Sequence, residues 1–219
     1  MDFDGDAVME TDDNPNFANI INTLQVIRAR KIAQNPDARE EIEENFSIPI
    51  LELESNQKAG KKSEVDLDKC FLSDDDLPEI LKAIIADGNI NVLLIDNNKI
   101  TDEGARIIAN FLEKSNIDDL SLSESGITDK GLKEIYNASL KNNTLTTFTF
   151  EPKNRKITPE ESEVLELILK QTAKNYADKL IDGLENMNIR YTGDDDITEP
   201  EQQLPPPKRA RQDPVIGRP

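Results

Sequence analysis

Carboxylates dominate the residues of this chain that could do chemistry. The 219 residues include 44 Asp and Glu, 26 Lys and Arg, one Cys, and no His or Trp. Without His, the commonest general base and metal ligand is missing, which excludes Ser-His-Asp and Cys-His catalysis and His-containing zinc sites. One Cys cannot form an internal disulfide or a CxxC site. We therefore expect a chain that is not an enzyme and that needs no cofactor or metal.

Three further patterns resemble chemical motifs but have structural explanations. The acidic run 74–76 precedes a predicted helix, where carboxylates cap backbone N–H groups. The segment that starts at Asp96 resembles a calcium loop, but it has Thr101 and Ile107 where such a loop needs Gly and Glu. Cys70 has no His partner and occupies a predicted buried position, so we expect it to be a packing residue.

The net charge of -18 limits the partners of the chain. Phosphates would repel it, so we expect no direct binding of nucleic acid, and basic partners are favoured. The first residues are acidic rather than basic and apolar, and no apolar run is long enough to span a membrane. These features predict a protein that acts in the cytosol or nucleus, although a secretion route without a signal peptide stays open.

The one basic cluster that stands out is Lys208-Arg209-Ala210-Arg211, which follows three prolines. It resembles a monopartite nuclear import signal, in which an extended basic segment lies in an acidic groove of an import adaptor. Prolines favour the extended form and lower the cost of ordering it. We expect Lys208, Arg209 and Arg211 to bind such an adaptor and the protein to be nuclear; the alternatives are a chance cluster in a disordered tail and a cytoplasmic protein.

The elements that would position any site are repeats. The pattern of Leu93, Ile95, Asn98, Ile100 and Gly104 recurs 27 residues later, and weaker copies precede and follow these two. Each copy continues into a segment with apolar residues at helical spacing. A period of 27–28 residues with strand, turn and helix in each unit predicts a solenoid.

The repeats resemble the leucine-rich repeat family, of the long type found in ribonuclease inhibitor. The shared pattern is L-x-x-L-x-L-x-x-N/C-x-I-t-d-x-G, and it covers roughly residues 62–175. The first repeat has Asp76 where Gly would stand. The last repeat carries about two extra residues before its helix, a feature loosely similar to the actin pointed-end-capping family. Short repeat proteins with a polar tail and no signal peptide also resemble effectors that intracellular bacteria deliver into host cells.

The expected fold class is α/β, a short leucine-rich-repeat solenoid of about four units. Its parts are an acidic leader at 1–13, a helical cap at 14–61, the solenoid with a capping helix at 62–190, and a disordered tail at 191–219. Within the cap, 48–53 could be an edge strand because of its Pro. Asn98 should hydrogen-bond loop backbone, and Gly104 and Gly131 should permit close approach or unusual dihedrals.

Strand side chains that alternate with the buried ones should line the concave surface, where solenoids commonly bind their partners. The expected partner-binding residues are Asp66, Asp68, Leu94, Asp96, Ser121, Ser123, Glu124, Thr149 and Glu151. Because this surface is acidic and short, a basic peptide, a histone-like tail or an exposed basic loop fits it. The predicted function is a non-enzymatic interaction module that acts in a eukaryotic nucleus, either as a regulatory protein of that cell or as an effector in a host cell. The alternatives are a cytoplasmic inhibitor or scaffold, a solvated face without a partner, and an enzyme with unrecognised carboxylate chemistry.

Overall fold

A computed structural model describes residues 17–59 and 63–191. The expected leader 1–13 and the basic cluster at 208–211 lie outside the described residues. The chain divides into two compact units, Met1–Asp182 and Gly183–Pro219. Only 183–191, the end of a helix, is described in the second unit. The elements in chain order are α1 Ala18–Gln34, the 3-10 turn η1 Pro36–Ala38, α2 Arg39–Ala59, β1 Ser63–Asp66, η2 Asp74–Asp76, α3 Leu77–Asp87, β2 Ile90–Leu94, α4 Asp102–Leu112, β3 Asp119–Ser121, α5 Asp129–Ser139, β4 Thr147–Thr149 and α6 Pro159–Tyr191.

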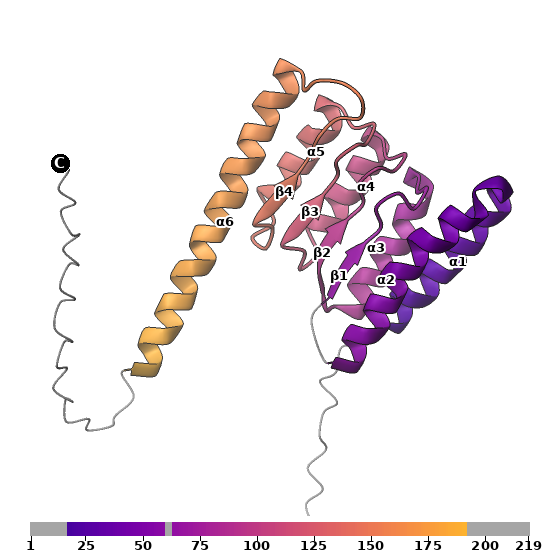
Figure 1. Cartoon of the computed structure of the whole chain (residues 1–219). Coiled ribbons are helices and arrows are strands. Elements are labelled where there is room, and N and C mark those ends of the chain that lie inside the picture. Colours follow the sequence, from indigo (N-terminus) through magenta and orange to yellow (C-terminus); the bar gives the residue numbers. More distant parts are fainter. Residues whose placement is uncertain (1–16, 60–62, 192–219) are drawn as a thin grey trace, which may run out of the picture. The chain divides into compact units, whose positions relative to one another are not determined.

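The repeats form the expected α/β solenoid. Four parallel strands follow one another in the order β1-β2-β3-β4, and each is paired with the next one along the chain. Figure 1 shows the strands in one layer and α3, α4 and α5 stacked behind them. The apolar residues that share one register, Val65, Leu93, Leu120 and Phe148, are all buried beneath these helices. The fold class predicted from the sequence is therefore confirmed.

The turn after each strand is built as the repeat pattern predicts. Asn98 is 2% exposed; its side-chain amide donates to the carbonyl oxygens of Leu67, Ile95 and Asp96 at 2.8–3.0 Å, and its Oδ1 accepts from the N–H of Leu72 at 2.9 Å. These bonds satisfy loop backbone groups that would otherwise be buried without partners.

An Asp–Thr relay joins consecutive repeats. The carboxylate of Asp74 accepts from the N–H and hydroxyl of Thr101, the N-cap of α4. Asp102, in the next repeat, accepts in the same way from Thr128, the N-cap of α5, at 2.8 Å. Each repeat thus completes the start of the following helix.

The glycines of the pattern make room for this relay. A Cβ on Gly104 would lie 2.2 Å from Oδ1 of Asp74, and one on Gly131 would lie 2.7 Å from Oδ1 of Asp102. Among the described residues the only glycine with positive φ is Gly88. Close approach is therefore what Gly104 and Gly131 provide, and the unusual dihedrals that the sequence also allowed are not used here.

Both ends of the solenoid carry an acid at this glycine position. In the first repeat, Oδ2 of Asp76 accepts from the N–H and hydroxyl of Ser73, so it replaces the carboxylate that no earlier repeat can supply. In the last repeat, Glu161 accepts from the N–H of Thr158 at 2.9 Å. The two acids are paired with Lys31 and Arg155, respectively.

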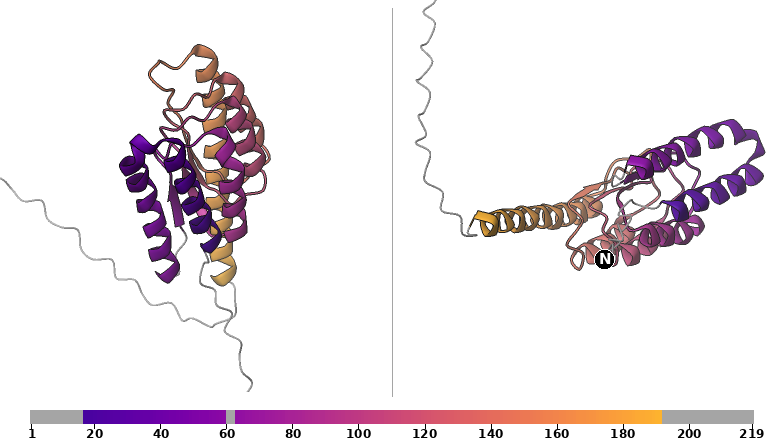
Figure 2. Two further views of the ribbon diagram at one scale, coloured as in Figure 1. Left: turned by 90° about the vertical axis from the view of Figure 1, so that its right-hand side faces the viewer. Right: turned by 90° about the horizontal axis from the view of Figure 1, so that it is seen from below.

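The N-terminal cap is a pair of helices. α1 packs against α2 and α3, as both views in Figure 2 show. The strand expected at 48–53 is wrong, because these residues lie inside α2. Pro49 has no N–H to offer the carbonyl of Asn45, and the thiol of Cys70 donates to that oxygen instead, at 3.5 Å. Tertiary packing of Phe46, Ile50 and Leu53 therefore outweighs the cost of a proline in the helix.

The solenoid ends with the 33-residue helix α6. The residues after Lys174, apolar at helical spacing in the sequence, continue this helix and form no separate one within the described residues. The amide of Asn175 donates to the carbonyl oxygens of Asn142 and Leu145 in the loop before β4. No helix within the described residues combines the length and the apolar character that crossing a membrane requires.

Candidate functional site

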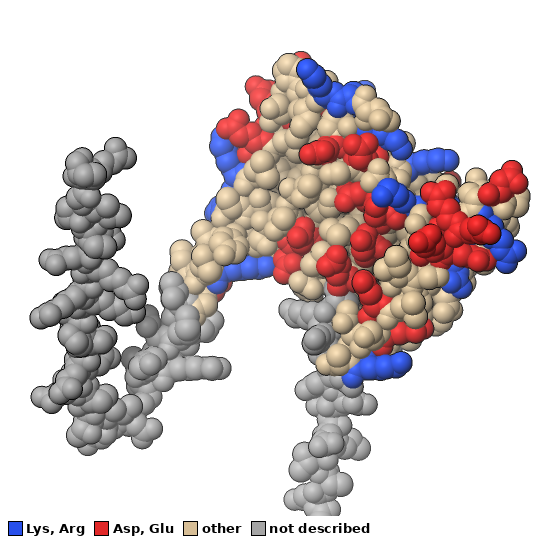
Figure 3. All heavy atoms as spheres, in the orientation of Figure 1, with Lys and Arg blue, Asp and Glu red and all other residues tan. Residues whose placement is uncertain are grey.

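The exposed face of the sheet brings the predicted columns together. Pairing places Asp66, Leu94, Ser121 and Thr149 in one row across the four strands. Asp68, Asp96, Ser123 and Glu151 follow these residues by two positions and form a second row at the carboxyl ends of the strands. Figure 3 shows Asp and Glu gathered over this face. We call the surface formed by Glu64, Asp66, Asp68, Asp96, Asp119, Glu124 and Glu151 the acidic sheet face.

Some of the predicted residues serve the structure of the face. Asp96 accepts from the hydroxyl of Ser121 at 2.7 Å and from the N–H of Ser123 at 2.5 Å, so it ties one repeat to the next. Ser121 is only 5% exposed. Asp68 accepts from the amide of Asn97 and pairs with Lys69 at 3.0 Å. These residues hold the surface in place more than they present free groups to a ligand.

Other carboxylates of the face form no ion pair with the described Lys and Arg residues. Within the described part of the chain, no Lys or Arg forms an ion pair with Glu64, Asp66, Asp119, Glu124 or Glu151. Burial and the charges of Asp66, Glu52 and Asp119 raise the pKa of Glu64. Burial and the charge of Asp118 raise the pKa of Asp119. An uncompensated negative field of this kind favours a cationic ligand.

Glu64 and Asp119 are the two residues of this face that the sequence analysis missed. They stand two positions before Asp66 and Ser121, so the same strand alternation would have included them.

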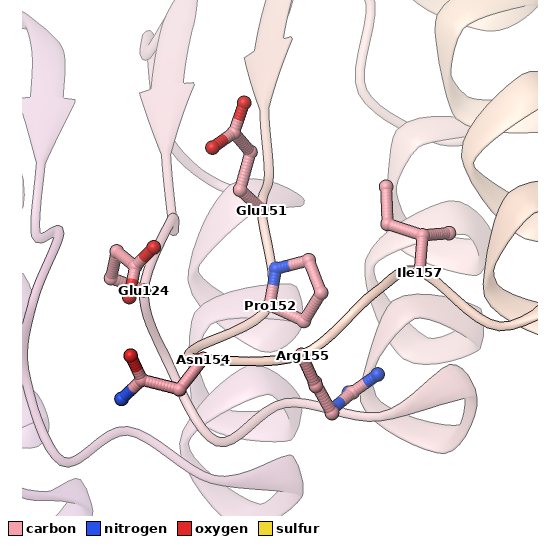
Figure 4. A pocket seen from close by; sticks show the side chains of 6 residues that line it. All are labelled: Glu124, Glu151, Pro152, Asn154, Arg155 and Ile157. Atoms are coloured by element: carbon pink, nitrogen blue, oxygen red, sulfur yellow. The ribbon is translucent and has the colours of Figure 1, made fainter.

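A pocket of about 310 Å³ lies at the carboxyl ends of β3 and β4. It is lined by Glu124, Glu151, Pro152, Asn154, Arg155 and Ile157. Figure 4 shows the two Glu side chains on neighbouring strand ends and Arg155 and Ile157 on the loop that leads to α6. Arg155 is held by Glu161 and by the carbonyl oxygen of Ile127. The wall is therefore fixed, and Glu124 and Glu151 are its free charges.

Backbone geometry places this wall. Lys69, Asn97 and Glu124 occupy equivalent turns and all have φ near +54°, and Asn154 has φ +53°. In the last repeat this left-handed residue comes 30 positions after Glu124 rather than 27 or 28, which is where the extra residues lie. The insertion therefore extends the turn that closes the pocket.

The neighbouring position, Ser125, corresponds to Asn98. Its hydroxyl is the one buried side-chain polar atom in the described residues that has no hydrogen-bond partner. The side chain of Ser is shorter than that of Asn, so it does not reach the carbonyls of its own repeat that are equivalent to those that Asn98 contacts. The turn at Ser125 therefore has fewer side-chain hydrogen bonds to its buried loop backbone than the turn at Asn98.

The chemistry of the face is electrostatic and hydrogen-bonding. Among residues 17–59 and 63–191 no cluster of three or more Cys, Asp or Glu could hold a metal ion. Burial raises the pKa of the Cys70 thiol to about 12, so this group is not a nucleophile at neutral pH. The face can bind cations and hydrogen-bond donors.

Two solved structures similar to the chain are domains of leiomodin and tropomodulin. The structure of "Leiomodin-1 Actin-Binding Site 2 (ABS2)" is 20% identical over 68% of this chain and 97% of that chain, with a TM-score of 0.49. The tropomodulin C-terminal domain of Caenorhabditis elegans is 15% identical over 56% and 89%, with a TM-score of 0.45. No family model matches the chain, and no curated protein does.

These comparisons correct the family expected from the sequence. The expectation was a leucine-rich repeat protein of the ribonuclease-inhibitor type with an import-like tail, and an effector of an intracellular bacterium was one of its two expected origins. The structures found are leiomodin and tropomodulin domains instead. The physical reason is that a 27-residue motif describes one repeat only. It carries no information about the helical pair that precedes the solenoid or the 33-residue helix that ends it.

Proposed function

We propose that this chain is a protein-interaction module that binds a basic protein or peptide on the acidic sheet face. The observation that carries the proposal is the set of carboxylates on this face that form no ion pair with the Lys and Arg side chains that the structure describes, at Glu64, Asp66, Asp119, Glu124 and Glu151. Opposite charge across an interface raises association rates and selects partners. A solenoid of four strands offers a short surface, which suits a peptide or one exposed loop.

A charge-neutral variant tests this proposal. Glu64→Gln/Glu124→Gln/Glu151→Gln removes three carboxylates to which no hydrogen bond is assigned, so the fold should stay intact. With a fluorescent Lys- and Arg-rich peptide as the probe, we expect affinity to fall about tenfold or more, because each close charge pair contributes on the order of 1 kcal/mol. Added salt should weaken binding of the unmodified chain.

The matched control is Glu134→Gln/Glu163→Gln/Asp178→Asn, which removes the same charge from exposed helix positions. If both variants lose affinity equally, net charge rather than the face attracts the peptide. If neither variant loses affinity, the acidic sheet face is not the binding site.

Actin is a second candidate partner. The specific observation is the insertion before α6, on which the similarity to the actin pointed-end-capping family was based, and the leiomodin-1 domain is named as an actin-binding site. Co-sedimentation with filaments and binding to monomeric actin provide the test. Actin binding that survives the triple Gln variant would assign actin to a surface other than the acidic sheet face.

Nuclear action is the part of the proposal that depends on Lys208, Arg209 and Arg211 alone. It stays a prediction, because these residues lie outside the described part of the chain. The test is the location of the full chain and of Lys208→Ala/Arg209→Ala/Arg211→Ala, each fused to a marker too large for passive entry. A nuclear wild type and an excluded variant would support it; two cytoplasmic fusions would favour the cytoplasmic alternative.

A further inference from the structure

α6 exposes a row of apolar side chains beside its buried row. The buried row contains Val164, Ile168, Thr172 and Asn175. The exposed row contains Leu169, Ala173, Tyr176 and Leu180, at intervals of four, three and four residues, which place them on one side of a helix. Leu169, Tyr176 and Leu180 are 51%, 56% and 53% exposed. We call these four residues the α6 row.

The α6 row faces the same side as the acidic sheet face. Each residue of an α-helix is turned by about 100° from the one before it, clockwise when the helix is viewed from its N-terminus. Most residues of the α6 row directly follow a residue of the buried row, so the α6 row is turned by about 100° from the buried row in that direction. In Figure 1, α6 descends with β4 on its right, so this displacement turns the row toward the viewer, as the exposed face of the sheet is turned. Figure 3, in the same orientation, shows an uncharged strip along α6 beside the acidic residues.

The strip between the two surfaces is formed by β4 and, at the amino-terminal end of that strand, by Lys179 of α6, whose ammonium donates to the carbonyl oxygen of Thr144 at 2.8 Å and lies 3.9 Å from the carboxylate of Asp118. β4 places Thr147 and Thr149 between the α6 row and the carboxylates of β3, and both are exposed. Threonine is short and uncharged, so a ligand can lie against this strand without losing a charge pair. The apolar row, the threonine strip and the acids then form one continuous surface.

We propose that this surface binds an amphipathic basic helix of the partner protein, with its apolar side against the α6 row and its Lys and Arg over the acidic sheet face. The inference rests on the proposed function and specifies the form of the partner. From Leu169 to Leu180 the helix rises by eleven residue steps, about 16 Å or three turns, and a helix of about 10 Å diameter fits beside it on the strands. Such a ligand presents apolar anchors at i, i+3 or i+4, and i+7, and its remaining positions are free to carry charge.

Charge and coverage favour this occupant over others. A second copy of the chain would bring a net charge of -18 against the same acids. A purely basic extended peptide would leave Leu169, Tyr176 and Leu180 exposed to water, although burying such side chains is favourable. Only a ligand with both chemistries on adjacent sides satisfies the whole surface.

Two peptide probes and two variants test the inference on the full chain. The first probe is a helical peptide of about 18 Leu and Lys residues with Leu at helical spacing. The second is a Lys- and Arg-rich peptide interrupted by prolines, which cannot form a helix. The variant Leu169→Ser/Tyr176→Ser removes the centre of the α6 row. The matched control is Leu167→Ser/Ile181→Ser, which changes side chains of α6 that are 41% and 53% exposed and lie outside the α6 row.

We expect Leu169→Ser/Tyr176→Ser to weaken the helical probe about tenfold or more. The proline-containing probe should bind this variant as it binds the unmodified chain, and the control should change either affinity less than about twofold. Thermal unfolding of both variants checks that they are folded, as their exposed positions predict. Unchanged binding of the helical probe by Leu169→Ser/Tyr176→Ser overturns the inference, and so does an equal loss in the control.

The same titrations separate this inference from the proposed function. If the proline-containing probe binds and depends on Glu64, Glu124 and Glu151, while the helical probe ignores the α6 row, the proposed function stands and the amphipathic partner is rejected. If the unmodified chain binds neither probe, the proposed function fails and the inference fails with it.

Discussion

The first and the last repeat of the solenoid use the same device in different surroundings. Asp76 and Glu161 both stand at the position of the middle glycines, and both accept from the N–H three residues earlier. At the first end, Lys31 meets Asp76 at 2.5 Å, and the two residues are 5% and 2% exposed. At the last end, Glu161 is 2% exposed but the side chain of its partner Arg155 is 38% exposed.

This difference separates a sealed end from an open one. The α1–α2 pair covers the first repeat, and the buried acid Asp87 holds α1 further by accepting from the amide of Asn19 and the N–H of Ile20. At the other end the ion pair borders a pocket, the hydroxyl of Ser125 has no hydrogen-bond partner among the described residues, and α6 exposes an apolar row. The sealed end contributes stability, and the open end is where surface remains for a partner. The following predictions test that division.

The largest effect should come from Lys31→Met. It leaves the buried Asp76 carboxylate with only the more distant and partly exposed Arg30, at 3.5 Å. Breaking a buried pair costs about 3–5 kcal/mol of unfolding free energy, and we expect a loss near the lower end of that range. Urea denaturation of the variant measures the loss, with Lys82→Met on the exposed side of α3 as the control. A loss below about 1 kcal/mol would show that the first end is not sealed by this pair.

A smaller effect should follow from Asn98→Ser. The substitution removes several buried hydrogen bonds to loop backbone, and we expect a loss of about 2 kcal/mol, because each unsatisfied buried group costs about 1–3 kcal/mol. The comparison is Ser125→Ala, which removes a hydroxyl that already lacks a partner and should change stability by less than about 0.5 kcal/mol. Equal losses in the two variants would contradict the difference between the two turns.

Glu161→Gln should cost less than Lys31→Met. Arg155 loses a partner but is already partly in water, so we expect a loss of about 1 kcal/mol. The same urea denaturation applies, and Glu160→Gln is the exposed control next to it. A cost equal to that of Lys31→Met would mean that the last end is as sealed as the first.

The smallest expected effect is the change of folding stability with pH. Its sign differs between the acids at the two ends of the solenoid and the acids of the acidic sheet face. Burial would raise the pKa of Asp76, but hydrogen bonds from Lys31 and Ser73 outweigh it and hold the pKa below the ordinary 3.8. The hydrogen bond from Arg155 likewise lowers the pKa of Glu161 below its ordinary 4.5. Both contributions are full above those ordinary values and are lost as the pH falls through the folded-state pKa.

The raised pKa values of Glu64 and Asp119 act in the opposite direction, because their charged forms weaken the folded state until protons bind. Stability should therefore rise slightly as the pH falls toward the ordinary pKa of 4.5 of Glu64 and then decline below about 4. Thermal unfolding at stepped pH shows the shape. Glu64→Gln/Asp119→Asn should remove the rise and keep the decline; a rise that persists in this variant would contradict the assignment.

The repeats could be predicted because their signal is local. The apolar spacing around Leu93 and Leu120 lies within 27 residues, and it gave the strands, the helices and the Asn98 turn. The Lys31–Asp76 pair joins residues 45 positions apart on elements that do not repeat, so no periodic spacing in the sequence predicts this ion pair. The segment at 48–53 failed for a related reason, since packing against the solenoid decides its helical form.

The candidate site could be predicted in part. Strand alternation gave Asp66 and Asp68, because period-two geometry needs only the register. It did not predict that the carboxylate of Asp96 accepts hydrogen bonds from Ser121 and Ser123, because these bonds depend on the distance between strands. The apolar residues of the α6 row can be read from the sequence, but the sequence does not show which side of the helix meets the sheet. That side is set by the hydrogen bonds of Asn175 to the loop before β4.

The Asp–Thr relay also makes the array extensible. The unit from Thr101 to Ile127 receives one carboxylate from the unit before it and offers an identical one to the unit after it. If a second copy of 101–127 were inserted before Thr128, the Thr at its start could donate to the Asp102 carboxylate of the original unit. The Gly of the copy would leave room for that carboxylate. The Asp of the copy would then serve Thr128 as before. Duplication of a single segment could therefore have lengthened this molecule, and could lengthen it again, without any compensating substitution in the flanking units.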